Sequence, residues 1–217
     1  MKTVALLPSL HPGIAVPPAH RINSGGDLII GLAGQIYATE EWQALLTALD
    51  TVGWKIRGRD VRIRLLGRWP RINASSPLRI EYLGWHTQEH TVKLLSEADL
   101  LYCPYWFDPV FETEARLSFA SKLTTYFAAG RPVLFHGPDY AAPAAFLKEN
   151  DAGFICNSNN QPRIIDALNT LAADEELCFR LASNARLAFD KHLTLDTLRS
   201  KFAEFLGVDE NFLLPVT

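Results

Sequence analysis

From Asp27 onward the chain alternates short apolar runs with longer segments whose apolar residues recur at helical spacing. A strand followed by a helix, several times over, predicts a parallel sheet covered by helices, because parallel neighbours need a crossover connection. The strands that we expect are 28–33, 61–66, 79–83, 98–103, 132–135 and 153–156. The pattern therefore predicts an α/β fold with one Rossmann-like unit, whose six parallel strands lie in the order 3-2-1-4-5-6.

Residues that interrupt or bound secondary structure divide the chain into three parts. Residues 1–27 are interrupted by prolines and glycines and are expected to be a linker. The Rossmann-like domain is expected over 28–206 and a C-terminal tail over 207–217. Side chains that cap helix N-termini mark the expected helix starts within the domain. These caps are Thr39, Thr87, Ser118, Asn160, Asp174 and Thr194.

Composition removes several classes of function. The chain has 217 residues, with 21 Lys and Arg against 24 Asp and Glu, and a formal net charge of −3. A weakly acidic chain has no global field that would attract nucleic acid. Cys103, Cys156 and Cys178 show no C-x-x-C spacing, so neither a disulfide framework nor a thiolate metal site is expected. No apolar run reaches the ~18 residues of a spanning helix, so we expect a cytoplasmic protein that touches membranes at most peripherally.

A basic stretch runs from Lys55 to Arg71, with only Asp60 to offset its charge. Within it, residues 61–65 alternate apolar and basic side chains as a half-buried edge strand does. Two interpretations remain open at this point. The cations form either a solvated edge or a patch for an anionic membrane surface.

Loops that follow the expected strands are candidate binding sites, because ligands of parallel α/β sheets lie beyond the carboxyl ends of the strands. The first loop holds Gly34 and Gln35 in a glycine-rich turn that lacks the G-x-G-x-x-G spacing of dinucleotide-binding folds. The second places Arg68 directly after a glycine, where a cation can meet an anion. The third carries Trp85 and His86, and the main-chain amide and carbonyl groups of this loop could bind a flat ring.

The fourth loop is the longest and leads to the helix expected from Ser118. Basic and hydroxyl side chains gather there, namely Arg116, Ser118, Ser121 and Lys122. A helix N-terminus offers unpaired amides and the positive end of the helix dipole, so these residues predict a phosphate site. The alternative is that Ser118 only caps the helix and that Lys122 is solvated.

Four segments share their order and spacing with one known family. The longest is Ser118–Leu134, which reads SFASKLTTYFAAGRPVL, and the others are Ile80–Trp85, Ala98–Pro104 and Asn184–Arg186. They resemble the C-terminal domain of GT-B glycosyltransferases of the group 1, family 4-like kind, over about 27–206. The resemblance implies a Rossmann-like half that binds a nucleotide-sugar donor. A further N-terminal domain or a partner chain would bind the acceptor, so this chain alone is expected to be inactive. The resemblance also implies that residues 1–27 are the end of that N-terminal domain and the linker that follows it.

The resemblance also gives each candidate residue an expected role. Glu112 or Glu114 is expected near the transferred sugar as the catalytic carboxylate, and Thr125 near the ribose. The diphosphate is assigned to Arg68, Arg116, Ser118, Ser121 and Lys122 and to the turn at Gly34 and Gln35, and the base to Trp85 and His86. The family implies neither a metal nor a cofactor beyond the nucleotide-sugar substrate.

Departures from the family pattern keep other functions open. Gln35 and Glu40 stand where members often have an arginine and a lysine, and Leu117 and Thr125 stand at the family's paired glutamates. These departures favour, as an alternative, a non-catalytic GT-B-like binding or assembly module. A sugar-nucleotide epimerase half on the same architecture is the other alternative.

The last expected helix, over 194–206, carries an apolar stripe. Its members are Leu198, Phe202, Phe205 and Leu206. In the resembling enzymes the closing helix crosses back toward the N-terminal domain. We therefore expect this helix to be poorly anchored or to pair with a second copy in the present chain.

Overall fold

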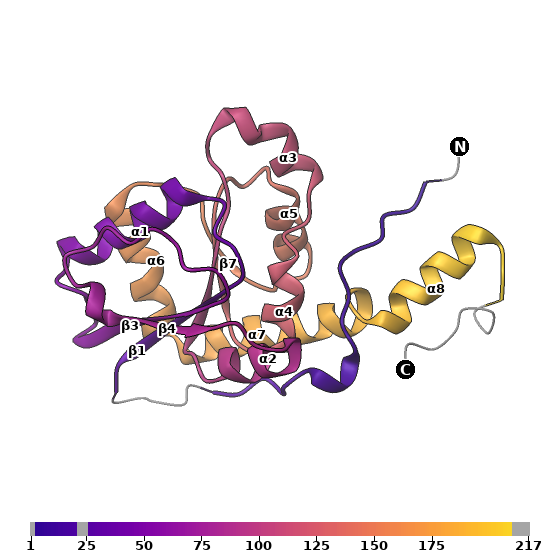
Figure 1. Ribbon diagram of the computed structural model, residues 1–217, viewed down its shortest axis with the longest axis horizontal. Helices are drawn as coiled ribbons and strands as arrows, with labels where there is room; N and C mark the ends of the chain where they lie inside the picture. Colours follow the sequence, from indigo (N-terminus) through magenta and orange to yellow (C-terminus); the bar gives the residue numbers. More distant parts are fainter. Residues whose placement is uncertain (1–2, 21–25, 210–217) are drawn as a thin grey trace.

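One sheet organises the chain, and its parallel strands follow the apolar runs of the sequence (Figure 1). The computed structural model describes residues 3–20 and 26–209. The parallel strands are β1 (Leu28–Ala33), β3 (Arg59–Leu66), β4 (Ile80–Gly84), β5 (Leu100–Pro104), β6 (Val133–His136) and β7 (Phe154–Cys156). They lie in the order β4-β3-β1-β5-β6-β7, and every neighbouring pair is parallel. The predicted order 3-2-1-4-5-6 is confirmed.

A seventh, very short strand was not predicted. β2 (Lys55–Ile56) pairs antiparallel with the first two residues of β3 at the margin of the sheet. Arg57 and Gly58 connect them, and both have positive φ angles of 50° and 80°. Two-residue hairpins require such angles, because the twist of the turn must match that of the strands. A two-residue strand has no periodicity from which it could be predicted.

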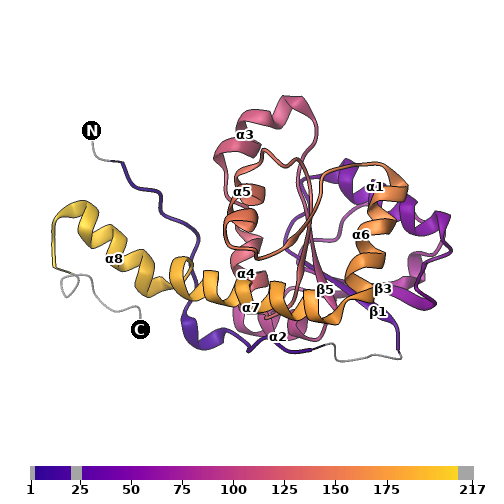
Figure 2. The same cartoon turned by 180° about the vertical axis from the view of Figure 1, so that it is seen from behind.

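Helices cover both faces of the sheet (Figure 2). α1 (Thr39–Thr51) and α6 (Gln161–Ala173) pack in one apolar cluster with side chains of β1 and β3. The second cluster, on the other face, contains residues of α2, α4, α5 and α7. Their bounds are Gln88–Ser96 for α2, Lys122–Ala128 for α4, Ala142–Glu149 for α5 and Glu175–His192 for α7. α8 (Leu195–Leu206) follows α7, and α3 (Glu112–Leu117) stands beyond the carboxyl end of β5. No helix among the described residues has the length and apolar character needed to cross a membrane.

Most of the expected helix caps are confirmed, and two are wrong. The side chains of Thr87, Asn160, Asp174 and Thr194 each accept a hydrogen bond from an amide in the first turn of their helix. α1 instead begins at Thr39 itself, after an Ala38 that has no side-chain cap. Ser118 ends a helix rather than beginning one, because the loop after β5 folds into the unpredicted α3 and the Ser118 amide bonds back to the Glu114 oxygen.

Ion pairs neutralise much of the basic stretch. Arg62 pairs with Asp27, and Arg64 pairs with both Glu81 and Glu97. Arg59 donates to Asp99 at 3.0 Å, and the two side chains are only 11% and 4% exposed. These pairs favour the solvated-edge interpretation of the stretch.

The N-terminal residues run along the face formed by the second cluster. The Val16 amide donates to the Ala128 oxygen at 2.7 Å, and Arg131 donates to the oxygens of Ala19 and His20. A short 3-10 turn, η1 (Pro12–Ile14), lies in this segment. Two others, η2 (Pro77–Arg79) and η3 (Pro109–Phe111), lie later in the chain. That residues 1–27 belong to the end of another domain stays a prediction; residues 1–2, 21–25 and most of the expected tail, 210–217, lie outside the described residues.

Gly130, which follows α4, lies directly against the N-terminal residues. Its φ is +66°, and a Cβ there would lie 2.8 Å from the Val16 oxygen. We expect Gly130→Ala to destabilise the domain by about 2 kcal/mol or more, because backbone strain and a clash with main-chain atoms add. A fall of about 4–8 °C in Tm would follow for a domain of this size. Gly58→Ala is the matched control, since Gly58 also has a positive φ but free space around a Cβ; an equal loss in both variants would contradict the contribution of the clash.

α8 extends away from the body of the domain (Figure 1). Ala203 is its one buried residue, whereas Phe202, Phe205 and Leu206 are 39–51% exposed. The apolar stripe expected from the sequence is therefore uncovered on the described structure. The anchor of α8 is at its start, where Leu10 forms a parallel bridge with Thr194.

We expect the amides of α8 to exchange with solvent faster than those of α7, because local opening is easiest where few side chains are buried. α7 buries five residues, Leu181, Ala182, Ala185, Ala188 and Phe189. Hydrogen exchange by mass spectrometry in a dilute sample tests this. Protection in α8 equal to that in α7 under these conditions would be the opposite result, and protection that rises with concentration would indicate self-association.

Candidate functional site

Three neighbouring strands end in glycines that form one floor at the carboxyl edge of the sheet. Gly34, Gly67 and Gly84 follow or end β1, β3 and β4, with φ angles of +87°, +99° and +82°. The Gly34 amide donates to the Leu66 oxygen at 2.9 Å, and the Gly67 amide donates to the Gly84 oxygen at 2.7 Å. A Cβ on Gly67 would lie only 3.2 Å from main-chain atoms of Gly34. The close approach of the two turns therefore requires glycine.

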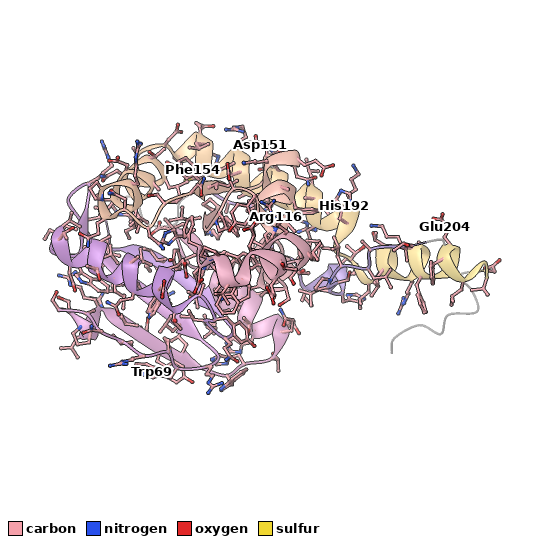
Figure 3. All side chains as sticks on the ribbon, turned by 90° about the horizontal axis from the view of Figure 1, so that it is seen from above. Trp69, Arg116, Asp151, Phe154, His192 and Glu204 are labelled. Carbon is pink, nitrogen blue, oxygen red and sulfur yellow. The ribbon has the colours of Figure 1, made fainter. Side chains whose placement is uncertain are left out.

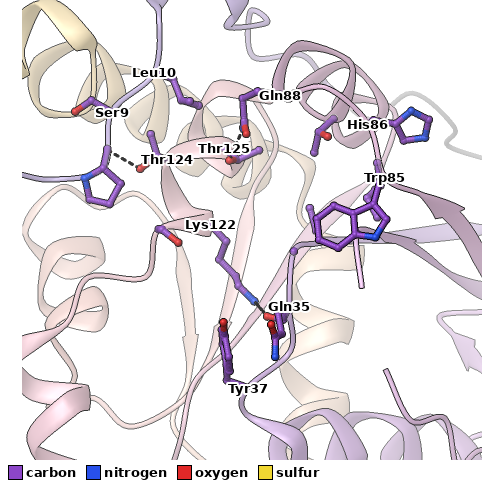
Figure 4. A pocket seen from close by; sticks show the side chains of 17 residues that line it. Ser9, Leu10, Gln35, Tyr37, Trp85, His86, Gln88, Lys122, Thr124 and Thr125 are labelled. Carbon is purple, nitrogen blue, oxygen red and sulfur yellow. Dashed lines mark hydrogen bonds between the residues drawn. The ribbon is translucent and has the colours of Figure 1, made fainter. Parts of the chain in front are cut away.

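A cavity of about 450 Å³ lies over this floor, and we call it the edge cavity (Figure 4). The loops after β1, β3 and β4 and the first turns of α2 and α4 form its walls. Residues 8–10 of the N-terminal segment complete it. Among the candidates from the sequence, it brings together Gly34, Gln35, Trp85, His86, Ser121, Lys122 and Thr125. No aspartate or glutamate is among the residues that line it.

Lys122 supplies the positive charge of the edge cavity. Its side chain extends from the first residue of α4, and Nζ donates to the Gln35 oxygen at 3.1 Å (Figure 4). Burial lowers the pKa of the ammonium group, and the nearby Cys103 thiol acts in the opposite direction. Burial also raises the pKa of Cys103 to about 12, so that this thiol is neutral. A desolvated cation without a carboxylate partner is a strong attractor for an anionic group.

Neutral polar side chains form the wall beside Lys122. Gln88 Nε2 donates to Thr125 Oγ1 at 2.7 Å, and Thr124 Oγ1 donates to the Pro8 oxygen at 2.9 Å (Figure 4). The first turn of α4 is less open to an anion than the sequence predicted. The amides of Leu123 and Thr124 already donate to the oxygens of Ala120 and Ser121.

Aromatic groups lie at the loop after β4. Trp85 is 74% exposed, and Figure 4 shows its indole on the side of the cavity away from Ser9 and Thr124. His86 Nε2 lies 2.8 Å from the Leu83 oxygen, and the His86 ring packs 4.5 Å from that of His90. The exposed indole is a surface on which a flat ring can stack.

The remaining candidates lie elsewhere. Arg116 pairs with Glu112 at 2.8 Å within α3, and its guanidinium lies over the Tyr140 ring at 4.4 Å. Glu114 and Ser118 are exposed, and neither they nor Glu112 and Arg116 are among the residues that line the edge cavity. Arg68 lines a neighbouring cavity described below.

Sequence reasoning missed several residues of the edge cavity. Tyr37 and Gln88 lie within about five residues of predicted strand ends, and Thr91 lies in the first turn of the helix predicted from Thr87; those positions were the available signal. Residues 8–10 carried no such signal, because their place depends on the contact with α4. Among the residues that the structure describes, no group of three His, Cys, Asp or Glu side chains is arranged to hold a metal ion.

A family model described as "Glycosyl transferases group 1" matches residues 27–174, which is more than half of the chain. The chain belongs to the group 1 glycosyl transferases. No curated protein matches the sequence significantly. The sequence resemblance to this family is thus confirmed, and the edge cavity lies within the matched region except for residues 8–10.

Solved structures share the fold of this group 1 domain. WaaG, a glycosyltransferase involved in lipopolysaccharide biosynthesis, has a TM-score of 0.63 and 16% identity, over 94% of this chain and 55% of that chain. HepE from Anabaena in complex with UDP-glucose has a TM-score of 0.66 and 17% identity, over 92% and 56%. The C-terminal domain of the group 1 family protein LpcC from Francisella tularensis has a TM-score of 0.57 and 15% identity, over 85% and 99%. The chain thus spans little more than half the length of the first two proteins and has the Rossmann-like fold of a GT-B half.

Proposed function

We propose that this chain is the donor-binding domain of a glycosyltransferase and that the edge cavity takes a nucleotide sugar. The observation that carries the proposal is Lys122, a desolvated ammonium group over a floor of glycine turns with no carboxylate beside it. A diphosphate supplies the missing negative charge, and main-chain approach at Gly34 leaves room for it. The Anabaena protein of the same fold was crystallised with UDP-glucose, which supports this class of ligand.

The other walls suit the other parts of a nucleotide. We place the base against Trp85, where an indole offers a stacking surface, and the ribose beside Thr125 and Gln88. The threonine hydroxyl and the glutamine amide offer neutral hydrogen bonds to ribose hydroxyls. Neutral partners bind more weakly than a carboxylate, so donor affinity rests mainly on Lys122.

In transfer, Lys122 would stabilise the charge that develops on the leaving diphosphate. A partly buried cation held by the Gln35 oxygen does this well, because it needs little reorganisation when the charge appears. Glu112 and Glu114 remain proposed for the sugar side, although Glu112 is paired with Arg116 in α3. We also propose that an acceptor-binding domain or a partner chain completes the active centre.

Nucleotide binding is the direct test of this function. We expect UDP or another nucleoside diphosphate to raise Tm in a concentration-dependent way, because a ligand that binds only the folded state stabilises it. Thr125→Val keeps the shape of the side chain and removes its hydroxyl, so it should weaken nucleotide binding without lowering Tm of the free protein. Absence of binding by UDP, GDP and ADP at millimolar concentration would overturn the donor proposal.

One observation favours a binding module without catalysis, namely the lack of a carboxylate among the residues that line the edge cavity. Assays of donor hydrolysis and of transfer to candidate acceptors, with an acceptor-binding domain supplied, separate the two functions. Nucleotide binding without any turnover in that assembled form would identify the module. Nucleotide release would identify the transferase.

A further inference from the structure

A second cavity, of about 620 Å³, lies between the start of α1 and the loop 67–76, which connects β3 to η2. We call it the arginine cavity. Gln35 is the one residue that lines both this cavity and the edge cavity. Figure 3 shows Trp69, another lining residue, at the outer edge of the domain. The two cavities are therefore neighbours with separate walls.

Side chains of α1 hold the main chain of the 67–76 loop in place. Trp42 Nε1 donates to the Arg71 oxygen at 3.1 Å, and Gln43 Nε2 donates to the Asn73 oxygen at 2.8 Å. Two turns further along α1, Asp50 accepts hydrogen bonds from the amide and the hydroxyl of Ser75. The loop is thus fixed at three points, and its exposed side chains project from a preorganised main chain.

Two arginines of this loop keep their charge available. Arg68 and Arg71 are exposed and line the arginine cavity, and neither forms an ion pair among the described residues. Arg62 and Arg64, which precede them on β3, are both paired with carboxylates. The lining of the arginine cavity contains no aspartate or glutamate. Two unpaired guanidinium groups at one cavity match the oxygens of a phosphate or a carboxylate.

Aromatic and amide groups make up much of the remaining wall. Trp69 is 51% exposed and meets Tyr82 edge to face at 4.9 Å, while Tyr82 Oη donates to the Gly67 oxygen at 2.6 Å. The Trp69 indole is thereby supported at the cavity. Gln43 and Asn73 add side-chain amides. An exposed indole covers the apolar face of a sugar ring, and amides bond to its hydroxyls.

We propose that the arginine cavity binds a carbohydrate that carries an anionic group, either a phosphate or a carboxylate. Its volume suits one or two sugar rings, within the range usual for small-molecule sites. Arg68 and Arg71 hold the anionic group, and Trp69 contacts the ring. The proposal does not depend on donor binding in the edge cavity, because the two sites share only Gln35.

Calorimetric titration without nucleotide tests this site with four probes: glucose 6-phosphate, glucuronate, glucose and inorganic phosphate. At least one of the two anionic sugars should bind about tenfold more tightly than both glucose and inorganic phosphate, and which one does so identifies the anionic group. Arg68→Ala and Arg71→Ala should each weaken that binding roughly tenfold to a hundredfold, because a charge-assisted hydrogen bond is lost. In Trp69→Ala, the anionic sugar should bind no more tightly than inorganic phosphate does.

Lys93→Ala is the control for the change in net charge, since Lys93 is exposed on α2 and lines neither cavity. This variant should bind as the wild type does, and a Tm comparison establishes that every variant is folded. The proposal is overturned if neither anionic sugar binds better than inorganic phosphate, or if both arginine variants bind with unchanged affinity. Failure of UDP binding leaves this result unaffected, so the two proposals fail separately.

Discussion

Replacing Lys122 with alanine should weaken UDP binding roughly tenfold to a hundredfold, which corresponds to the about 1.5–3 kcal/mol of a charge-assisted hydrogen bond. Nζ of Lys122 lies over the glycine floor, and no other lysine or arginine is among the residues that line the cavity to take its place. Isothermal titration at fixed ionic strength measures the change. Unchanged affinity would remove Lys122 from the binding site.

Stability of the variant protein needs a separate measurement. Burial lowers the pKa of Lys122, which means that the folded chain pays a desolvation cost for this ammonium group. Lys122→Met keeps most of the aliphatic chain without the charge, so its Tm should not fall, while its UDP affinity should fall as in Lys122→Ala. Lys93→Ala again controls for net charge.

Lowering the pH from 7 to 4 should remove about 3 kcal/mol of stability through His136 alone. Burial lowers the pKa of this imidazole from 6.5 to about 4, and the residue is 1% exposed. Above pH 6.5 the ring is neutral in both folded and unfolded chains, so it has no effect on stability. As the pH falls below 6.5 the unfolded chain takes up the proton first, and the folded state loses stability until the pH reaches about 4.

Chemical denaturation at a series of pH values measures this loss, with His136→Gln as the comparison. The side chain of His136 lies between Tyr102 Oη, 2.7 Å from Nδ1, and the Ser158 oxygen, 2.9 Å from Nε2. A glutamine amide does not titrate, so the pH dependence between 6.5 and 4 should flatten in this variant even if its stability at pH 7 is lower. An unchanged slope would assign the loss to other groups.

The sheet could be predicted from the sequence because each parallel strand is an apolar run bounded by turn residues. The apolar residues of β1, β5 and β6 are almost all buried, so their runs are nearly continuous. Helix starts were predictable where a side chain bonds to its own first turn, as at Thr87. The start of α4 was not, since the hydroxyl of Ser121 makes no such bond and α3 intervenes.

The site was predictable to the extent that it follows from topology. Gln35 and Trp85 lie just beyond β1 and β4, and Lys122 begins the helix that leads from β5 to β6, so all three come to the same edge of the sheet. The roles proposed for Glu112 and Arg116 could not be judged from residue types, because the i, i+4 spacing in α3 pairs them with each other. The contact between Thr124 and Pro8 joins residues 116 positions apart, and no local pattern encodes it.

Residues 8–10 serve two parts of the molecule at once. Pro8 accepts a hydrogen bond from Thr124 in the wall of the edge cavity, and two residues later Leu10 exchanges main-chain hydrogen bonds with Leu193 and Leu195 at the start of α8. Only Ser9 separates the two points of contact. A ligand that displaced Pro8 would therefore disturb the base of α8, and by linkage a partner that moved α8 would then change the affinity of the cavity by the same free energy. Residues 8–10 thus connect the wall of the edge cavity to the start of α8.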